Sequence, residues 1–385
     1  MEDLLYFASQ AAKENIDWHG IGNALSSFVG PMSQTAQNPE FHAEGDVWTH
    51  TRMVCEELVK LDHFHGLPEE QQQAVFLAAL LHDIGKIPTT RWEDGKWTSP
   101  NHTLVGSKMA RQFLWQELGL CGTPEKQQLR ETVCNLIRYH SFPPHAIDDP
   151  DGKRRLMAIA ANGKNCPMFT IQLLRLLCEA DALGRKCEDK AHMLEQIGLC
   201  AELAKENSCY DGSFPFPSGH TLYAYLSGRD IAPEVELFDD TWGEVILVSG
   251  LPGTGKDTWI LDQYPDLPMI SLDEIRREMK ISPKDNQSKV LEIARERAKE
   301  LLRKKQPFVW NATNLNPMIR KKQIKMFTQY HASTRIVYLE TDWEEQLRRN
   351  AGREAAVPEA AICHMMEELV LPEAQEAAVV EWQII

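Results

Sequence analysis

The sequence predicts two domains of different fold class: an all-α N-terminal half, and an α/β C-terminal half with a parallel sheet and a helical lid. In the first half, apolar residues recur at helical spacing between about residues 50 and 190. From residue 245 onward, short apolar runs alternate with helical patterns, as in a parallel α/β sheet. A stretch rich in Pro, Gly and Ser at 210–220 separates the two patterns. We therefore expect domains at 1–235, with a core at about 40–190, and at 236–385.

Composition narrows the class of protein. The chain has 385 residues, of which 43% are hydrophobic and 25% charged, as in soluble globular proteins. No apolar run approaches the roughly 18 residues of a membrane span, the first residues lack a basic signal, and the 9 cysteines show no paired spacing. We expect a cytoplasmic protein without a membrane partner. A net charge of -15 argues against nonspecific coating of duplex nucleic acid. The basic clusters 153–155, 303–305 and 320–322 are expected on solvated helix faces.

Histidines and aspartates gather at the ends of the apolar helices of the first half, or inside them. The set is His50, His82, Asp83, His102, His140 and Asp181. Burying a carboxylate such as Asp181 on an apolar helix is costly unless a metal or a partner compensates. Neutral imidazoles and carboxylates suit a divalent transition metal, and the lack of a thiolate argues against a structural zinc cage. The pattern predicts a hydrolytic metal centre; the alternative is a group of structural histidines.

The order His50, His82-Asp83, Asp181 resembles the HD phosphohydrolase superfamily, an all-helical metal-dependent fold, over about residues 40–190. The segment 42–47 is similar to the HD domain of bacterial CCA-adding enzymes, which remove 2′-phosphates and open 2′,3′-cyclic phosphates. His102 and His140 match the extra histidines of two-metal members. The resemblance implies two ions, as Mn²⁺, Ni²⁺, Co²⁺ or Fe²⁺. The first would bind His50, His82, Asp83 and Asp181, and the second Asp83, His102 and His140.

Further side chains near this set are expected to contact the substrate. Lys86, about one helical turn beyond Asp83, can neutralise phosphate charge. His42 can orient the substrate or protonate the leaving group. His145 and Arg185 are additional candidates for phosphate contacts.

A glycine-rich segment follows the first apolar strand of the second half. Residues 250–258 read Gly-Leu-Pro-Gly-Thr-Gly-Lys-Asp-Thr, after a strand at 245–248 and before a helix. This is the context of a phosphate-binding loop, in which Lys256 reaches the transferred phosphate. Asp257 stands where Ser or Thr is usual; either it or Thr258 approaches Mg²⁺, and we favour Thr258. The expected nucleotide-binding set is Gly250, Gly253, Thr254, Gly255, Lys256, Asp257, Thr258, Arg349 and Arg353. A glycine-rich turn without a nucleotide is the alternative.

The remaining elements of the second half place further charged residues near this loop. We expect strands at 268–271, 307–311 and, as the last one, 335–339, a helix at 289–305, and a lid at 351–358 before a final helix. Asp273 follows a strand end, where ligands bind in such sheets, and is the expected general base; a helix cap is the alternative. Arg276 is expected on the acceptor phosphate. Arg349 and Arg353 can stabilise transition-state charge, although Arg349 can also be a solvated helix charge.

The segments 273–276, 313–317 and 349–353 are similar to the polynucleotide 5′-kinase of phage and its bacterial relatives, over about residues 244–375. This resemblance implies Asp273 as base, Arg276 as acceptor contact and Arg353 as lid arginine. Ala312 stands where the phage enzyme has an acidic residue, so a role for that position is not carried over.

The two halves together resemble the bacterial HD-Pnk enzymes. That family implies ATP and Mg²⁺, phosphorylation of 5′-OH ends of RNA, with DNA ends as an alternative, and removal of 2′,3′-cyclic or 2′-phosphates. An RNA ligase partner and a homodimer are further expectations. One alternative is a nucleotide phosphohydrolase fused to a small-molecule kinase. The other is a nucleotide-sensing module without turnover.

Overall fold

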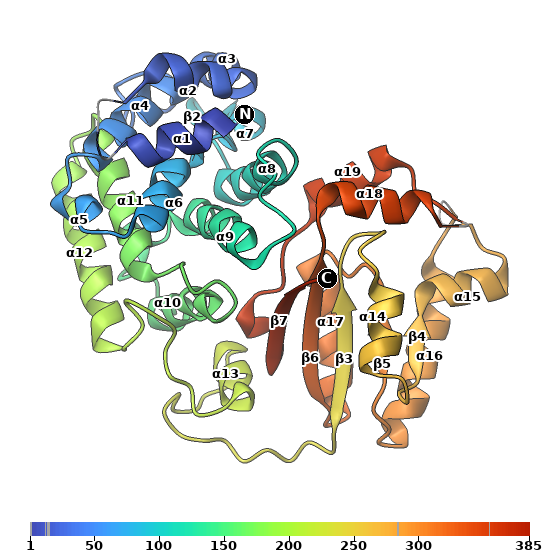
Figure 1. The fold of residues 1–385 in the computed structure, drawn as a ribbon. Helices are drawn as coiled ribbons and strands as arrows, with labels where there is room; N and C mark the ends of the chain where they lie inside the picture. Colours follow the sequence, from blue (N-terminus) through green and yellow to red (C-terminus); the bar gives the residue numbers. More distant parts are fainter. Residues whose placement is uncertain (1, 12, 14–15, 283–284, 354) are drawn as a thin grey trace. The chain divides into compact units, whose positions relative to one another are not determined.

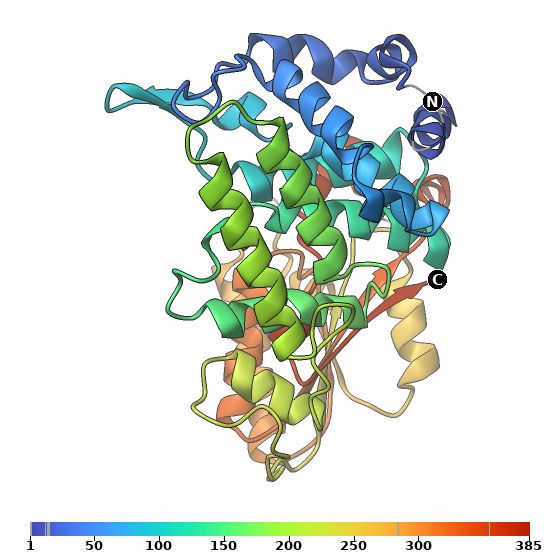
Figure 2. The ribbon, with the colours of Figure 1, turned by 90° about the vertical axis from the view of Figure 1, so that its left-hand side faces the viewer.

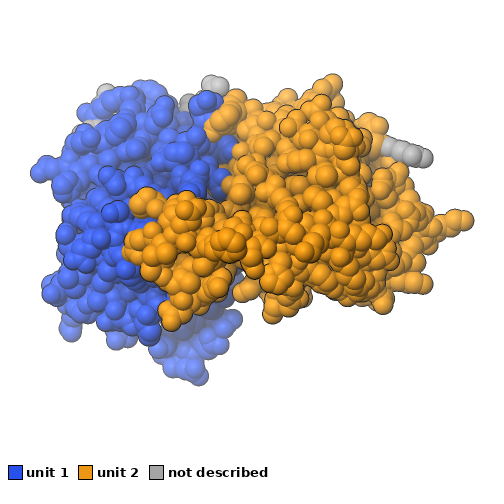
Figure 3. Space-filling view, turned by 90° about the horizontal axis from the view of Figure 1, so that it is seen from below, with its two compact units in different colours: residues 1–120, 125–214 blue, residues 121–124, 215–385 orange. Residues whose placement is uncertain are grey.

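The computed structural model describes residues 2–11, 13, 16–282, 285–353 and 355–385. The chain separates into two compact units (Figure 3). Unit 1 contains residues 1–120 and 125–214, and unit 2 contains residues 121–124 and 215–385. Unit 1 is helical apart from one small hairpin, and unit 2 contains a parallel five-stranded sheet with helices, so the predicted fold class is confirmed.

Unit 1 is a bundle in which helix α6 is buried along its second half. All eight residues from Ala74 to Leu81 are buried, and α11 packs against α4, α6 and α12. Its elements are α1 (Glu2–Gln10), α2 (Trp18–Ala24), α3 (Ser26–Gln34), α4 (Val47–Leu58), α5 (Asp62–His65), α6 (Glu69–Leu81), α7 (Lys86–Thr89), β1 (Arg91–Glu93), β2 (Lys96–Thr98), α8 (His102–Gln116), α9 (Pro124–Tyr139), η1 (Pro143–His145), α10 (Gly152–Ala161), η2 (Asn162–Lys164), α11 (Ile171–Gly184) and α12 (Lys190–Glu206).

Side-chain caps fix the start of the helices that carry the expected metal ligands. Asp46 accepts a hydrogen bond from Thr49 N at 2.9 Å at the start of α4, and Thr170 accepts one from Leu173 N at 3.2 Å at the start of α11. The β1–β2 hairpin was not predicted and projects from unit 1 (Figure 2). Its turn, Asp94-Gly95, has positive φ at both residues, which is the sequence signal that could have identified it.

The sheet of unit 2 has the order β4-β5-β3-β6-β7, and all pairs are parallel. Helix α14 packs on one face, whereas α16 and α17 pack on the other, around Trp310 and Phe327 (Figure 1). The elements are α13 (Gly219–Leu226), β3 (Glu244–Ser249), α14 (Lys256–Gln263), β4 (Met269–Ser271), α15 (Leu272–Met279), α16 (Ser288–Arg303), β5 (Val309–Asn311), α17 (Pro317–Gln329), β6 (Ser333–Glu340), α18 (Trp343–Ala351), α19 (Glu359–Glu368), η3 (Ala374–Glu376) and β7 (Val379–Ile384).

Two expectations for unit 2 are wrong. The strand at 335–339 is not the last one, because β7 follows α19 and pairs with β6 along its whole length. The basic cluster 320–322 is not wholly solvated, because Arg320 is fully buried. Its guanidinium donates to both carboxylate oxygens of Glu376, at 2.6 and 2.7 Å, and to backbone carbonyls of the 314–315 and 370–371 segments. Within the described residues, no helix is long and apolar enough to cross a membrane.

Candidate metal centre and phosphate-binding loop

Unit 1 brings all six expected metal ligands into one buried cluster. Their Nε2 atoms converge on two carboxylates from the ends of α6 and the middle of α11. His50 Nε2 lies 3.0 Å from Asp181 Oδ1, and His82 Nε2 lies 3.2 Å from Asp83 Oδ2. Asp83 Oδ1 faces His102 Nε2 at 3.6 Å and His140 Nε2 at 4.0 Å. Asp83 therefore lies between two groups of ligands, as expected for a bridging carboxylate.

The other ring nitrogen of each histidine is already engaged. The Nδ1 atoms of His82, His102 and His140 donate to the backbone carbonyls of Ala79, Ser99 and Ile137, at 2.8 to 2.9 Å. A carbonyl can only accept, so these contacts place the proton on Nδ1 and leave the Nε2 lone pair free to bind a metal. His50 differs, because its Nδ1 contacts a carboxylate.

The cluster fits a divalent metal by its unsatisfied atoms. His82 Nε2 and Asp83 Oδ1 are buried and have no hydrogen-bond partner among the described residues, a costly state unless a ligand satisfies them. Burial and the neighbouring histidines lower the pKa of His140 to about 3, so its ring is neutral at pH 7. Burial opposes ionisation of Asp83, but Lys86 and His82 outweigh it and hold the pKa of the carboxyl well below its usual range. Neutral imidazoles beside ionised carboxylates suit such an ion.

Glu44 is the residue that sequence reasoning missed in this cluster. Its buried Oε1 lies 2.8 Å from His42 Nδ1 and 2.9 Å from His50 Nδ1. Its Oε2 accepts from Lys186 N at 2.9 Å. Glu44 lies inside the segment that resembles the CCA-type HD domain, between two residues with evident roles, and this position was the available signal.

The two expected substrate contacts of unit 1 lie beside the cluster. Lys86 Nζ lies 2.7 Å from Asp83 Oδ2 and 3.4 Å from His42 Nε2. Burial and Lys86 lower the pKa of His42 to about 4, so its ring is also neutral at pH 7. Arg185 forms a two-point contact with Asp181, at 3.1 and 2.6 Å. His145 is exposed, at the end of η1.

A close backbone approach brings His102 to Asp83. Gly85, which precedes α7, contacts the first turn of α8. A Cβ atom at Gly85 would meet His102 O at 2.0 Å and Gly106 N at 2.5 Å, both of them backbone atoms. No side chain fits at this position, so glycine is required for the approach of the two segments.

In unit 2, the phosphate-binding loop joins β3 to α14 as expected. Gly253 has φ +85°, and a Cβ there would meet Gln346 O at 2.5 Å. Lys256 Nζ donates to Gly250 O at 2.9 Å and Leu251 O at 2.8 Å, so it is folded back over the loop. Burial lowers the pKa of Lys256 to about 8. A cation held by a glycine-rich turn at a helix N-terminus fits a phosphate group.

Asp257 and Thr258, the two candidates for Mg²⁺, differ in how they are held. Asp257 Oδ1 accepts a hydrogen bond from Asn311 Nδ2 at 2.6 Å. Thr258 is exposed. Asn311 ends β5, the neighbour of β3, and sequence reasoning gave it no role. Because an amide holds its carboxylate, the geometry favours Asp257 as the side chain that faces the ion.

The other charged residues expected in the kinase site also follow the carboxyl ends of strands. Asp273 lies in the first turn of α15 and contacts Arg276, and its Oδ2 lies 3.7 Å from Arg353 Nη2. Arg349 Nη1 donates to Thr254 O at 3.0 Å. The cap alternative for Asp273 is wrong, because Ser271 caps α15 through Glu274 N. Of the expected lid, Glu354 lies outside the described residues. The catalytic roles stay predictions.

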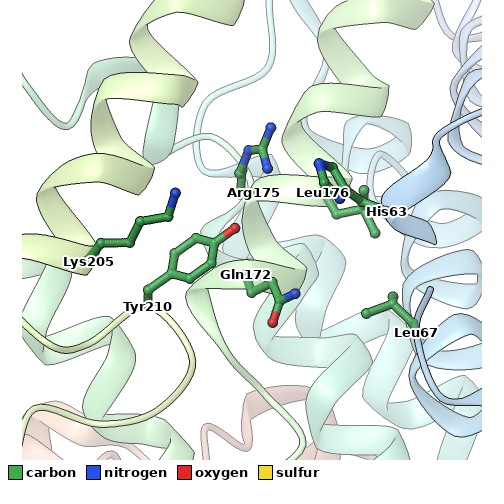
Figure 4. Close-up of a pocket in the computed structure, with 7 residues that line it drawn as sticks. All are labelled: His63, Leu67, Gln172, Arg175, Leu176, Lys205 and Tyr210. Carbon is green, nitrogen blue, oxygen red and sulfur yellow. The ribbon is translucent and has the colours of Figure 1, made fainter. Parts of the chain in front are cut away.

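A pocket of about 290 Å³ lies elsewhere in unit 1, and none of the expected site residues lines it (Figure 4). Arg175, Lys205 and Tyr210 contribute to its wall, and the Lys205 ammonium lies 5.1 Å from the Tyr210 ring. Both cations also contact carboxylates, Arg175 to Glu179 and Lys205 to Glu202, so little of their charge is left for a ligand.

Comparison with known families agrees with both sites. Residues 47–185 match the family model described as the HD domain, and residues 245–372 match one described as an AAA domain, of P-loop kinase-like type. No curated protein matches the chain. The protein therefore joins an HD domain, the class of metal-dependent hydrolases, to a P-loop kinase-like domain. The first domain implies a divalent metal, and the second implies a nucleotide with Mg²⁺.

Proposed function

We propose that this protein is a bifunctional enzyme that heals the ends of broken RNA. Its kinase site transfers the γ-phosphoryl group of ATP to a 5′-OH end, and its HD site removes a 2′,3′-cyclic phosphate or a 2′-phosphate. The observation that carries the proposal is the pairing, in one chain, of a buried His/Asp cluster containing Lys86 with a phosphate loop facing Asp273 and Arg353. Cleaved RNA carries both kinds of end, and a ligase needs both corrected.

In the kinase step, Asp273 accepts the proton of the acceptor hydroxyl as the oxygen bonds to the γ-phosphorus and ADP leaves. Arg276 and Arg353 both contact or face Asp273, so the base lies between two cations that can also bind phosphate oxygens. Lys256 lies close enough for Arg353 and Asp273 to influence its pKa. These four side chains thus surround one position for the reacting phosphoryl group.

In the hydrolase step, water adds its oxygen to phosphorus, the bond to the ribose oxygen breaks, and that oxygen takes up a proton. When bound, the divalent ions would supply a water-derived nucleophile near neutral pH. Lys86, 2.7 Å from Asp83, can move its ammonium to a phosphate oxygen at the centre. His42, neutral and held by Glu44, orients the substrate through its Nε2.

One RNA oligonucleotide tests both activities. It carries a labelled 5′-OH end and a 2′,3′-cyclic phosphate, and is incubated with ATP, Mg²⁺ and, separately, Mn²⁺, Ni²⁺ or Co²⁺; electrophoresis and mass then resolve each end. We expect a 5′-phosphate to appear and the terminal phosphate to disappear. Asp273→Asn should lose only the first change, and Asp83→Asn only the second.

Other outcomes assign the protein differently. A wild-type enzyme that acts on free nucleotides and small hydroxyl compounds, and leaves both RNA ends unchanged, contradicts the proposal and supports a nucleotide phosphohydrolase fused to a small-molecule kinase. A protein that binds ATP without turnover on either class supports a sensing module.

A further inference from the structure

Helix α17 carries an unusual charge distribution for this chain. It contains four basic residues and no acidic residue, in a chain with 56 acidic and 41 basic residues. Sequence reasoning expected its basic cluster to be an ordinary solvated face. The structure instead divides the cluster, because Arg320 is an internal anchor whereas Lys321 and Lys322 are exposed.

The exposed residues form one line along the helix, which we call the lysine stripe: Met318, Lys321, Lys322 and Lys325. Their spacing of three, four and seven residues places them on one face, opposite the buried Gln323, Ile324 and Phe327. Met318 is 70% exposed, which is uncommon for a large apolar side chain.

The lysines of the stripe have no carboxylate partner within 4.0 Å in the described part of the chain. By contrast, Arg276, Arg297 and Arg320 in the same unit each contact one. The ammonium groups of the stripe are therefore available to an external anion.

The stripe begins at the phosphate-binding loop. The segment between β5 and α17 is bonded to the loop, because Gly250 N donates to Thr313 O at 3.0 Å and Asn314 Nδ2 donates to Val248 O at 2.7 Å. Arg320 then fixes the first turn of α17 to the same segment through Asn314 O and Leu315 O, both at 3.0 Å. The stripe is thus held rigidly relative to the carboxyl edge of the sheet, where Lys256 and Asp273 lie.

We propose that the lysine stripe binds the phosphate backbone of the acceptor strand, downstream of the 5′-OH that is phosphorylated. This inference rests on the proposed kinase function and deepens it. From Met318 to Lys325 the stripe runs about 10 Å along the helix, and Met318 offers an apolar surface to a nucleobase at the end nearest the site. Ammonium groups are point charges that bind phosphates without reading sequence. The stripe therefore selects acceptors by length.

The test compares two variants with the same loss of charge. Lys321→Gln/Lys322→Gln removes the centre of the stripe. Lys304→Gln/Lys305→Gln removes an equally exposed adjacent pair just after α16, before the amino end of β5 and so at the opposite edge of the sheet. Acceptors are 5′-OH oligouridylates of 2 and 12 nucleotides. The readouts are KM for the acceptor, and binding of a fluorescent 12-mer measured by anisotropy between 0.05 and 0.3 M KCl.

For wild type and the 304/305 variant, we expect the 12-mer to bind much better than the dinucleotide. For the 321/322 variant, we expect KM for the 12-mer to rise by up to about 25-fold at 0.1 M salt, because each lost contact to a single strand removes about 0.7 from the slope of log affinity against log salt. KM for the dinucleotide should change less than about twofold. Met318→Ala should weaken binding of the 12-mer without changing the salt slope.

Equal KM and equal salt slope for the 12-mer in wild type and the 321/322 variant would overturn the inference while leaving the kinase assignment in place. Equal loss in the 304/305 variant would overturn it too, since the effect would then be one of overall charge. If wild type phosphorylates neither acceptor, the proposed function itself fails, and this is visible before any variant is compared. Unchanged HD activity in each preparation shows that the variant chain is folded.

Discussion

Glu44 Oε1 lies 2.9 Å from Nδ1 of His50, on the side of the ring that faces away from the other metal ligands. The contact fixes the orientation of the imidazole and directs Nε2 into the cluster. A carboxylate behind a metal-binding histidine also makes the histidine a stronger ligand. The same Glu44 atom holds His42, so one side chain positions both a metal ligand and an expected substrate contact.

We expect Glu44→Ala to weaken metal binding by unit 1 about 10- to 100-fold, as is usual when such a supporting group is removed. Titration of the metal-stripped protein with Mn²⁺, followed by electron paramagnetic resonance, measures this directly. Glu40→Ala is the matched control, because Glu40 lies in the same loop and is exposed. Kinase activity should be equal in all three proteins. Wild-type Mn²⁺ affinity in Glu44→Ala would contradict the positioning role.

Asp257 should be the side chain that approaches Mg²⁺, since Asn311 holds its carboxylate at 2.6 Å. Asp257→Asn is expected to raise the Mg²⁺ concentration for half-maximal kinase activity by about tenfold or more, whereas Thr258→Val should change it less than about twofold. Without metal the carboxylate repels ATP, so Asp257→Asn should bind a fluorescent ATP analogue more tightly than wild type in EDTA. The reverse ranking of the two variants would assign the role to Thr258.

The stability of unit 1 should decrease in acid because of Glu131. Burial raises the pKa of this carboxyl, but the guanidinium groups of Arg111 and Arg130 outweigh burial, and the net pKa is lowered. Its stabilising contribution is thus fully present above the unfolded pKa of about 4.5 and is lost as pH falls through the lower folded value. Glu131→Gln should unfold more easily by about 3–5 kcal/mol at pH 7, and depend less on pH below 4.5.

Calorimetry between pH 3 and pH 7 measures both effects of Glu131→Gln. Glu117→Gln is the control, because Glu117 is exposed on the same unit. A Glu131 variant with the acid sensitivity of wild type would show that other carboxylates cause the loss of stability.

Arg320→Met should destabilise unit 2 by about 3–5 kcal/mol, because it leaves Glu376 buried without its partner and frees the carbonyls of the 314–315 segment. The double change Arg320→Met/Glu376→Met should cost less than the sum of the single changes, since no unpaired charge remains. Urea unfolding measures all three variants, with the exposed Lys304→Met as control. Additive effects would show that the pair does not act as a unit.

The sequence predicted the chemical groups of both sites better than the contacts that hold them. The six expected ligands were recognisable because polar ligand types are rare on apolar helices, and the phosphate loop because its spacing is local. Glu44 and Asn311 were missed because their importance arises only from pairing; Asn311 meets Asp257 across 54 residues of chain.

The missed structural features have similar causes. Strand β7 needs β6 as its partner, which lies far away in the sequence, and a six-residue run alone does not indicate that pairing. Arg320 looked like its lysine neighbours. Its helical phase, shared with Gln323 and Phe327, could have shown that it is buried, but charge was weighed before periodicity.

The glycine at position 85 gives the metal centre a vulnerability that its ligands do not reveal. A methyl group there would overlap the His102 carbonyl at 2.0 Å, so α8 would have to shift, carrying His102 away from Asp83. The centre could then lose one ion while every coordinating side chain remained present. Inactive natural variants of such a domain can therefore arise from one added carbon atom, and an inventory of ligands would classify them as intact.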